Sequence, residues 1–320
     1  MPIRPLTLDK MYEVRANKTG TAGHKNFIHT LLYSTIPKVK LQTELNNLAA
    51  RVASFHEPPK ASGEQWQTFC DKTVVALMAG GESTRYAAVL EGKKVHKNAH
   101  ELPNGDTMIE MAIRAYRDAG LKNFVALVYH NAHSIENRLG DGSSMGVHIT
   151  YSQDPEPPAG KGGAVRNALE NGAIPKDCNL FVVNPDDVVL DFPGSFVRYV
   201  GEAHLEGEKK GMLATAVLAP GQAYHSTGMM VVDNKVVDTQ MYPLIPVPAH
   251  VGITVFSPKI LPRFYELFSL KEKSDFEQVL FPILAKEKTL WSAGLTKGTW
   301  IAVNDLKSYK TLIEKLGKDE

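Results

Sequence analysis

The chain has 320 residues, enough to bury one large hydrophobic core or two smaller ones. With 43% hydrophobic and 22% charged residues its composition is ordinary for a globular protein, and its net charge of +1 argues against a dedicated nucleic-acid-binding or membrane-surface protein. Its two cysteines, Cys70 and Cys178, suggest neither a disulfide framework nor a zinc cluster. Because neither a signal peptide nor a bilayer-spanning apolar segment is apparent, we expect a cytoplasmic protein.

The first 72 residues read differently from the rest and are predicted to form a helical extension. Residues 26–55 have helix-like apolar spacing in places, interrupted at Pro37. The stretch 57–64, which contains two prolines and a glycine, is typical of a linker. We therefore divide the chain into an extension, residues 1–72, and one larger domain, residues 73–320.

The next segment, residues 73–85, combines an apolar run with a glycine pair and polar residues. The unbroken apolar run Thr73–Ala79 predicts a buried parallel strand. Gly80 and Gly81 allow a sharp turn that brings backbone N–H groups close to a ligand, and Arg85 is suited to phosphate oxygens. The segment predicts a phosphate site at the carboxyl edge of a sheet. The alternative is a plain Gly-Gly turn followed by a solvated arginine.

Strands and helices alternate in the following stretch. Thr107 is the predicted N-cap of a helix that runs to Ala119, and Ser134–Leu139 predicts a second, shorter helix. Phe124–Tyr129 and Val147–Ser152 have the apolar character of strands. This alternation predicts βαβ units and a mostly parallel sheet.

A loop rich in proline and glycine follows, at residues 153–163. It opens a predicted helix near Gly162, whose start would present free N–H groups to an anion or a base edge. Gln153 carries a donor and an acceptor on one amide and could read the edge of a nucleobase. The alternative is an ordinary surface loop before a helix.

Two adjacent carboxylates follow the next predicted strand, Leu180–Val183. Asp186 and Asp187 would lie at the strand's carboxyl end, where hard oxygen ligands beside phosphates suit Mg²⁺. The alternative is an Asx-type turn before a helix that starts near Pro193.

The remaining elements complete an α/β pattern. Met212–Leu218 predicts another strand, and residues 228–237 predict a hairpin with Asp233 and Asn234 at its turn. Phe276–Lys286 predicts a helix that Pro282 would kink or shorten, and an amphipathic helix ends the chain. His250 is expected to have a structural role.

Several of these segments, in this order, resemble motifs of the sugar-phosphate nucleotidylyltransferase family. Gly80–Arg85 resembles its Gly-Gly-x-Gly-Thr-Arg loop, with Ser83 at the third glycine. Residues 153–164 resemble its Gln-x-x-Pro-x-Gly-x-Gly/Ala-x-Ala loop. Pro185-Asp-Asp looks like its metal motif, especially that of the UTP–glucose-1-phosphate uridylyltransferase branch, and residues 250–256 resemble its Asn-x-Gly-Ile-Tyr-Val-Phe strand. The resemblance extends over residues 73–318.

The resemblance implies a fold, a reaction and roles for single residues. The fold is a three-layer α/β/α sandwich with a mixed, mostly parallel, Rossmann-like sheet. The reaction joins a nucleoside triphosphate, with UTP or dTTP favoured, to a sugar 1-phosphate and releases pyrophosphate. Arg85 and Lys97 would be catalytic, with Lys94 as the rival for the lysine, and Gly252 would border the sugar. Asp186 and Asp187 would bind the Mg²⁺ cofactor. The implied nucleotide-binding residues are Ala79, Gly80, Gly81, Glu82, Ser83, Thr84, Gln153, Gly160 and Lys161.

The sequence also departs from the family's pattern. The expected Glu-Lys pair before the sugar strand is absent from residues 238–243. The second metal aspartate, expected two residues after Trp300, is Ala302, and Asp305 lies three positions later. Two alternatives therefore stay open: a glycosyltransferase of the same fold, and a non-catalytic nucleotide-sugar sensor or subunit. A homo-oligomer is also left open.

Overall fold

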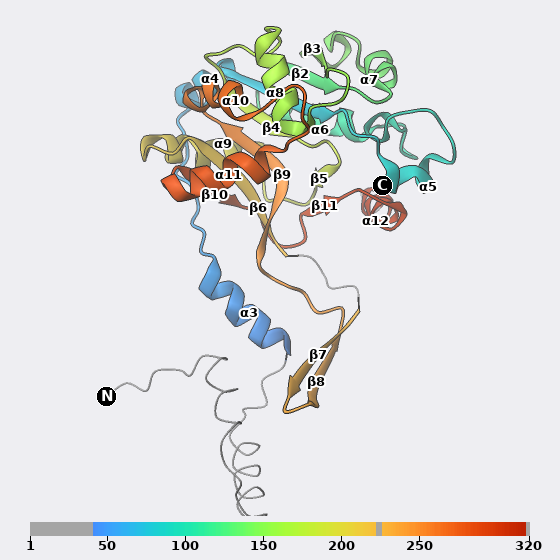
Figure 1. The fold of residues 1–320 in the computed structure, drawn as a ribbon, viewed down its shortest axis with the longest axis vertical. Coiled ribbons are helices and arrows are strands. Elements are labelled where there is room, and N and C mark those ends of the chain that lie inside the picture. Colours follow the sequence, from blue (N-terminus) through green and yellow to red (C-terminus); the bar gives the residue numbers. More distant parts are fainter. Residues whose placement is uncertain (1–40, 222–225, 318–320) are drawn as a thin grey trace, which may run out of the picture. The chain divides into compact units, whose positions relative to one another are not determined.

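The computed structural model describes residues 41–221 and 226–317 and falls into two compact units (Figure 1). The larger unit comprises residues 49–222 and 245–320, and the smaller comprises residues up to Leu48 together with Ala223–Leu244. Predictions about residues 1–40 lie outside the described residues. Across the described ranges, no helix has both the length and the apolar character needed to cross a bilayer.

The larger unit is built on a seven-stranded sheet. Its strands are β1 (Thr73–Ala79), β2 (Asn123–Val128), β3 (His148–Gln153), β4 (Asn179–Val183), β6 (Ala214–Pro220), β9 (Pro248–Phe256) and β10 (Leu290–Gly294). They lie in the order β10-β6-β9-β4-β1-β2-β3. All pairings are parallel except those of β9, which runs antiparallel to β4 and β6. The predicted mixed, mostly parallel sheet is confirmed.

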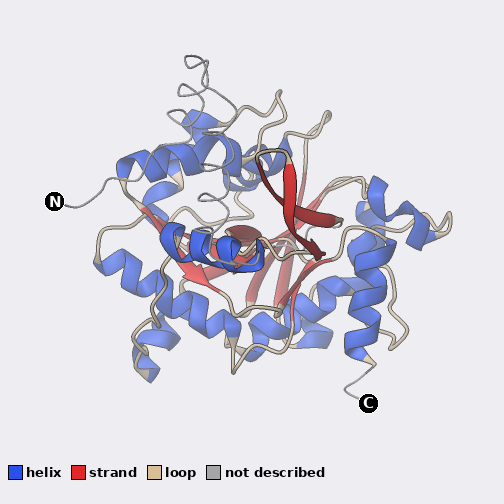
Figure 2. Ribbon diagram, turned by 90° about the horizontal axis from the view of Figure 1, so that it is seen from below, coloured by secondary structure: helices blue, strands red, loops and turns tan. Residues whose placement is uncertain are grey.

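Helices cover both faces of this sheet (Figure 2). Successive side chains of β1 point to opposite faces, as the period of a strand requires. Val75 and Leu77 pack on one face with α4 (Gly63–Asp71), α6 (Met108–Asp118), α7 (Ala132–Leu139) and α9 (Phe196–Lys209). Val74 and Ala76 pack on the other face with α8 (Gly160–Glu170), α10 (Pro262–Leu267) and α11 (Phe276–Glu287). The predicted three-layer α/β/α sandwich is confirmed.

A small annex packs beside the sheet around a third apolar cluster. Its two-stranded antiparallel sheet consists of β5 (Asp187–Val189) and β11 (Trp300–Ala302). Its helices are α5 (Ala87–Leu90) and α12 (Leu306–Leu316), and Tyr86 and Leu312 are buried between them. The short 3₁₀ helices of the unit are η1 (Thr84–Tyr86), η2 (Lys97–Ala99), η3 (Ser143–Met145) and η4 (Pro258–Ile260).

Local sequence signals explain several helix boundaries. Thr107 caps α6 as predicted: its hydroxyl accepts the Glu110 N–H, and the Glu110 carboxylate accepts the Thr107 N–H in return. Asp305 caps α12 in the same way. Pro282 lies inside α11, and the helix continues through it to Glu287.

Helix α4 lies within the predicted extension, yet it belongs to the core of the larger unit. Trp66, Phe69 and Cys70 are buried against the sheet's helical layer, and the Trp66 indole donates to the Ala119 carbonyl at 2.8 Å. The sheet's core therefore includes residues from the segment assigned to the extension, while the division of the chain at residue 72 stays a prediction.

The smaller unit contains the predicted hairpin, β7 (Thr227–Val232) and β8 (Lys235–Met241). Asp233 and Asn234 at its turn both have positive φ, of 48° and 63°, as the twist of a two-residue hairpin loop requires. The first residues of α3 (Leu41–Val52) bind this hairpin: the Leu41 N–H donates to the Asp238 carboxylate at 2.6 Å.

Candidate functional site

The carboxyl ends of β3, β2, β1 and β4 open into one cavity of about 590 Å³. In open α/β sheets this edge is where ligands bind. The predicted site residues that line it are Gly80, Gly81, Glu82, Ser83, Thr84, Arg85, Lys97, Gly160, Lys161, Asp186 and Asp187. Ala79, Gln153, Gly252 and the rival Lys94 are not among its lining residues. Most of the predicted site thus comes together in one place.

The glycine loop follows the carboxyl end of β1 and lines the cavity. A Cβ on Gly80 would lie 3.3 Å from the Tyr129 Cβ, so the glycine lets the ends of β1 and β2 approach closely. Ser83 has a φ of 59°, in the left-handed region where glycine is favoured. The family motif's third glycine therefore corresponds here to a position with positive φ, and a short polar side chain adopts that conformation instead.

Two cations beside this loop converge on one amide oxygen. Arg85 Nη2 donates to Asn304 Oδ1 at 3.1 Å, and Lys97 Nζ donates to the same oxygen at 3.3 Å. Lys97 Nζ also lies 2.5 Å from Asp186 Oδ2, with both side chains largely buried. Lys97 is held in the cavity by η2, whose N-cap His96 accepts the Asn98 N–H through its ring Nδ1. The arrangement fixes two positive groups where the phosphates of a ligand would lie.

The second carboxylate of the acidic pair is held by neutral donors. Asp187 accepts a hydrogen bond from the Trp300 indole at 2.8 Å and one from the Asn184 amide at 3.0 Å. Burial, and then the charge of the neighbouring Asp186, raise the pKa of Asp187 to about 7. Gly252 has a φ of 67°, and a Cβ there would lie 2.2 Å from both Asn184 Nδ2 and Asp187 Oδ2. Gly252 therefore leaves space for the Asp187 carboxylate and its partner, and its role beside the sugar stays a prediction.

The C-terminal tail contributes a residue that the sequence analysis missed. Ala302, at the position of the expected second metal aspartate, pairs with Asp187 between β11 and β5. Asp305 accepts the Ser308 N–H at 2.8 Å and caps α12. Asn304 lies between them in sequence and presents its amide oxygen to the cavity. Asn304 was not predicted because a carboxylate was expected in this region, although a polar residue two positions after a short strand was a usable signal.

The comparisons with known proteins agree with this geometry. A family model described as nucleotidyl transferase matches residues 74–319. This chain belongs to the nucleotidyl transferase family. A structure described as a glucose-1-phosphate thymidylyltransferase from Bacillus anthracis with sucrose is similar at 17% identity and a TM-score of 0.56, over 78% of this chain and 96% of that one. A UDP-glucose pyrophosphorylase with bound UDP-glucose is similar at 14% identity and a TM-score of 0.57, over 78% and 99%. At these identities the two structures support the fold alone.

The donor set of this nucleotidyl transferase suits a single hard cation. No group of three or more His, Cys, Asp or Glu side chains with metal-binding spacing occurs within residues 41–221 and 226–317. The adjacent carboxylates of Asp186 and Asp187 are nevertheless enough for Mg²⁺, which commonly takes one or two protein carboxylates and completes its shell with water and substrate phosphates. Two partly buried like charges would also be stabilised by a divalent cation. The residues present therefore fit Mg²⁺, whose binding stays a proposal.

The start of α8 differs from its prediction. The Lys161 N–H donates to Asp275 Oδ1 at 3.0 Å and the Gly162 N–H donates to the Ser274 carbonyl at 3.0 Å, so these two donors are not free for a ligand. A Cβ on Gly160 would lie 2.7 Å from the Ser274 carbonyl oxygen, which explains the glycine there. The side chain of Lys161 lines the cavity and pairs with the Glu277 carboxylate. What α8 offers a ligand is therefore the Lys161 cation and not a free helix terminus.

The residue after Gln153 lines the cavity in its place. Gln153 is exposed, and its backbone carbonyl accepts from the Asn167 amide at 2.8 Å. Asp154 follows at the end of β3, and burial raises the pKa of its carboxyl group to about 6. A base-reading role for Gln153 stays a prediction.

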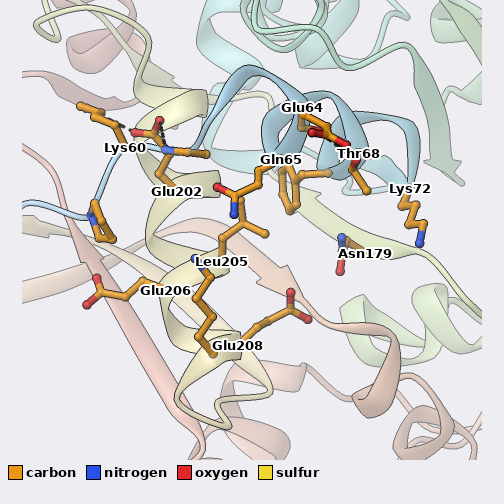
Figure 3. Close-up of a pocket in the computed structure, with 14 residues that line it drawn as sticks. Lys60, Glu64, Gln65, Thr68, Lys72, Asn179, Glu202, Leu205, Glu206 and Glu208 are labelled. Carbon is orange, nitrogen blue, oxygen red and sulfur yellow. Dashed lines mark hydrogen bonds and ion pairs between the residues drawn. The ribbon is translucent and has the colours of Figure 1, made fainter.

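A second cavity, of about 510 Å³, lies at the opposite edge of the sheet, where Lys72 precedes β1 and Asn179 begins β4. Figure 3 shows its walls, formed by α4 and α9. Glu202 is buried there and forms ion pairs: its Oε1 accepts a hydrogen bond from Arg198 Nε at 3.1 Å, and Lys60 Nζ lies 3.3 Å from its Oε2, which accepts no hydrogen bond from the described residues. Because its buried charge is already paired, this cavity offers no site comparable to the first.

Proposed function

We propose that this chain transfers a nucleotidyl group from a nucleoside triphosphate to a sugar 1-phosphate, forming an NDP-sugar and pyrophosphate. The observation that carries the proposal is the cluster of Arg85, Lys97, Asn304 and Asp186 beside the glycine loop. It supplies fixed positive charge at the edge of the sheet where β1 and β4 end. The family membership supports the same reaction class.

The proposed chemistry is an in-line displacement that needs no covalent enzyme intermediate. A phosphate oxygen of the sugar 1-phosphate forms a bond to the α-phosphorus as the bond from that phosphorus to the bridging oxygen breaks, and pyrophosphate leaves with the electron pair. Arg85 and Lys97 neutralise charge on the leaving group, while Asn304 holds both cations in place. The glycine loop positions the triphosphate through its backbone.

Asp186 and Asp187 would hold Mg²⁺ in this proposal. When bound, the ion supplies further neutralisation of phosphate charge and helps to orient the triphosphate. The Trp300 indole and the Asn184 amide keep the Asp187 carboxylate oriented toward the cavity. The resemblance to the uridylyltransferase branch predicts UTP or dTTP as the donor. The proposed reaction is the same whichever base the nucleoside triphosphate carries.

One observation favours a second candidate, a non-catalytic nucleotide-sugar sensor. Ala302 provides no carboxylate, and Asp186 already pairs with Lys97 at 2.5 Å, which would weaken its hold on a metal. A sensor would bind nucleotide or NDP-sugar and release no pyrophosphate.

The test is a pyrophosphate-release assay with Mg²⁺, crossing nucleoside triphosphates against a panel of sugar 1-phosphates and identifying the product by mass. We expect release that depends on one pair of substrates and is lost in Arg85→Ala. Lys94→Ala is the matched control for Lys97→Ala, because Lys94 is three residues away and does not line the cavity. Nucleotide binding without release from any pair would contradict catalysis and support the sensor. In a parallel assay that supplies NDP-sugars instead, release of nucleoside diphosphate would indicate a glycosyltransferase.

A further inference from the structure

The cations beside the glycine loop lie at one end of the cavity. Arg85 and Lys97 lie where β1 and β4 end, together with the proposed Mg²⁺ ligands Asp186 and Asp187. At the other end, after β2 and β3, Tyr129 and Asp154 line the cavity. The Tyr129 hydroxyl donates to the Glu156 carboxylate at 2.5 Å, and this hydrogen bond is the main cause that raises the pKa of the hydroxyl.

A nucleoside triphosphate would lie across the cavity from one end to the other. In the proposed function its phosphates lie with Arg85, Lys97 and the glycine loop, so a base that extends along the sheet edge lies toward β2 and β3. The strands β4, β1, β2 and β3 are consecutive neighbours, which places the two ends about 14 Å apart at about 4.8 Å per strand. That span accommodates a nucleotide in an extended form. Met78, Leu127 and Ala164 supply the apolar contacts that a base needs.

Asp154 is the acidic residue placed to meet the base edge. It lines the cavity at the end of β3, and its side chain is partly buried. In the part of the chain that the structure describes, its Oδ1 is buried and has no hydrogen-bond partner. A buried polar atom without a partner is uncommon and destabilising, and a ligand donor is one way to satisfy its carboxylate.

We propose that Asp154 selects a base with an exocyclic amino group, so that the donor is GTP, ATP or CTP in preference to UTP or dTTP. The inference rests on the proposed function for the presence of a nucleotide, and it replaces the base predicted from the resemblance. An ionised carboxylate only accepts hydrogen bonds. Guanine, adenine and cytosine each offer it an amino group. Uracil and thymine offer one N–H between two carbonyl oxygens, and those oxygens would face the negative charge of Asp154.

Gln153, the residue before Asp154, would not make the same selection among bases. A glutamine amide carries both a donor and an acceptor and could serve any base by rotating. Gln153 lies one residue earlier and does not line the cavity, because side chains alternate between the two faces of a strand. The residue that faces the base is therefore one that cannot donate.

The first experiment measures nucleotide binding by calorimetry on the full chain, with no sugar phosphate present. Three pairs of nucleotides vary the amino group. GTP against ITP removes the 2-amino group alone. CTP against UTP and ATP against ITP replace an amino group with a carbonyl oxygen and also change the neighbouring ring nitrogen from an acceptor to an N–H donor. We expect at least one amino-bearing member to bind about tenfold or more tightly than its partner, since hydrogen bonds to charged groups are worth that much. Equal binding in all three pairs, or tighter binding of UTP or dTTP than of every amino-bearing nucleotide, would overturn the proposal.

The second experiment compares Asp154→Asn with the wild type. The amide removes the charge and adds a donor for a carbonyl oxygen, so the preferred pair should lose about tenfold or more of its discrimination. Asp177→Asn makes the same change at an exposed position away from the cavity and should leave the ratios unchanged. A folded Asp154→Asn variant, checked by its thermal transition, with unaltered ratios would overturn the role of Asp154.

Binding and turnover separate this inference from the proposed function. Selective binding of an amino-bearing nucleotide without pyrophosphate release would support base selection by Asp154 and contradict catalysis. Pyrophosphate release from UTP or dTTP alone would support catalysis and overturn base selection.

Discussion

Removing the Lys97 ammonium should expose how strongly the site depends on one ion pair. We consider Lys97→Met, which keeps an unbranched side chain and removes the charge. Lys97 and Asp186 are 14% and 12% exposed, and their charged atoms lie 2.5 Å apart. Breaking a buried pair by deleting one partner destabilises a protein by about 3 to 5 kcal/mol, because the remaining charge stays buried. The cavity admits water on one side, so we expect about 3 kcal/mol.

The assay is urea unfolding of a double-mutant cycle. Lys97→Met and Asp186→Asn should each be destabilising, and the double variant should recover about 1 kcal/mol or more relative to the sum of the two. Lys94→Met is the matched control and should change the free energy of unfolding by less than about 0.5 kcal/mol. A loss below about 1 kcal/mol in Lys97→Met, or strictly additive effects in the cycle, would refute the ion-pair reasoning.

Three further predictions concern the packing and ionisation of buried groups. Gly252→Ala should destabilise the protein by about 2 kcal/mol or more, because the added methyl group overlaps the Asp187 carboxylate and the residue must keep a positive φ. Gly298→Ala is the control: its φ is 84° and no atom lies within 4 Å of the added methyl group, so it should show the backbone cost alone. Equal losses of stability in denaturant unfolding would contradict the overlap. The folded-state pKa of Asp187 lies above its unfolded value, so its ionisation lowers the free energy of unfolding as the pH rises from about 4 to about 7. Without added metal, the free energy of unfolding of Asp187→Asn should therefore rise relative to that of the wild type by up to about 1.4 kcal/mol per pH unit. Parallel curves of unfolding free energy against pH for the two proteins would count against this. Burial raises the pKa of Cys70 to about 11 and of Cys178 to about 12, so neither thiol should react with a disulfide reagent at pH 8 until the protein unfolds, and rapid labelling of the native protein would contradict their burial.

Local patterns predicted the elements well where one physical cause dominated. The unbroken apolar run after Lys72 is typical of a strand that is buried on both faces. Thr107 and Glu110 specify a helix start by reciprocal hydrogen bonds. The meeting of the glycine loop and the paired aspartates in one cavity could be predicted because each follows a strand, and the carboxyl ends of parallel strands lie at one edge of the sheet.

Contacts between distant segments were beyond such patterns. Asn304 reaches the cavity only because β11 pairs with β5, more than a hundred residues earlier in the chain. The donors at the start of α8 are taken by Ser274 and Asp275, which nothing in the local sequence of α8 indicates. Whether Gln153 or Asp154 lines the cavity depends on which of two neighbouring side chains points to that face at the end of β3, and the apolar spacing of the strand does not determine this.

The pairing of β11 with β5 also bears on the order in which the cavity forms during synthesis. The Val303 N–H donates to the Asp186 carbonyl at 2.8 Å, so one wall of the cavity comes from a segment made more than a hundred residues after Asp186. Strands β1 to β4 could emerge from the ribosome and pair before Asn304 has been added. Arg85 and Lys97 would until then have no shared anchor, and the pocket would become complete only once residues 300–304 had joined the sheet.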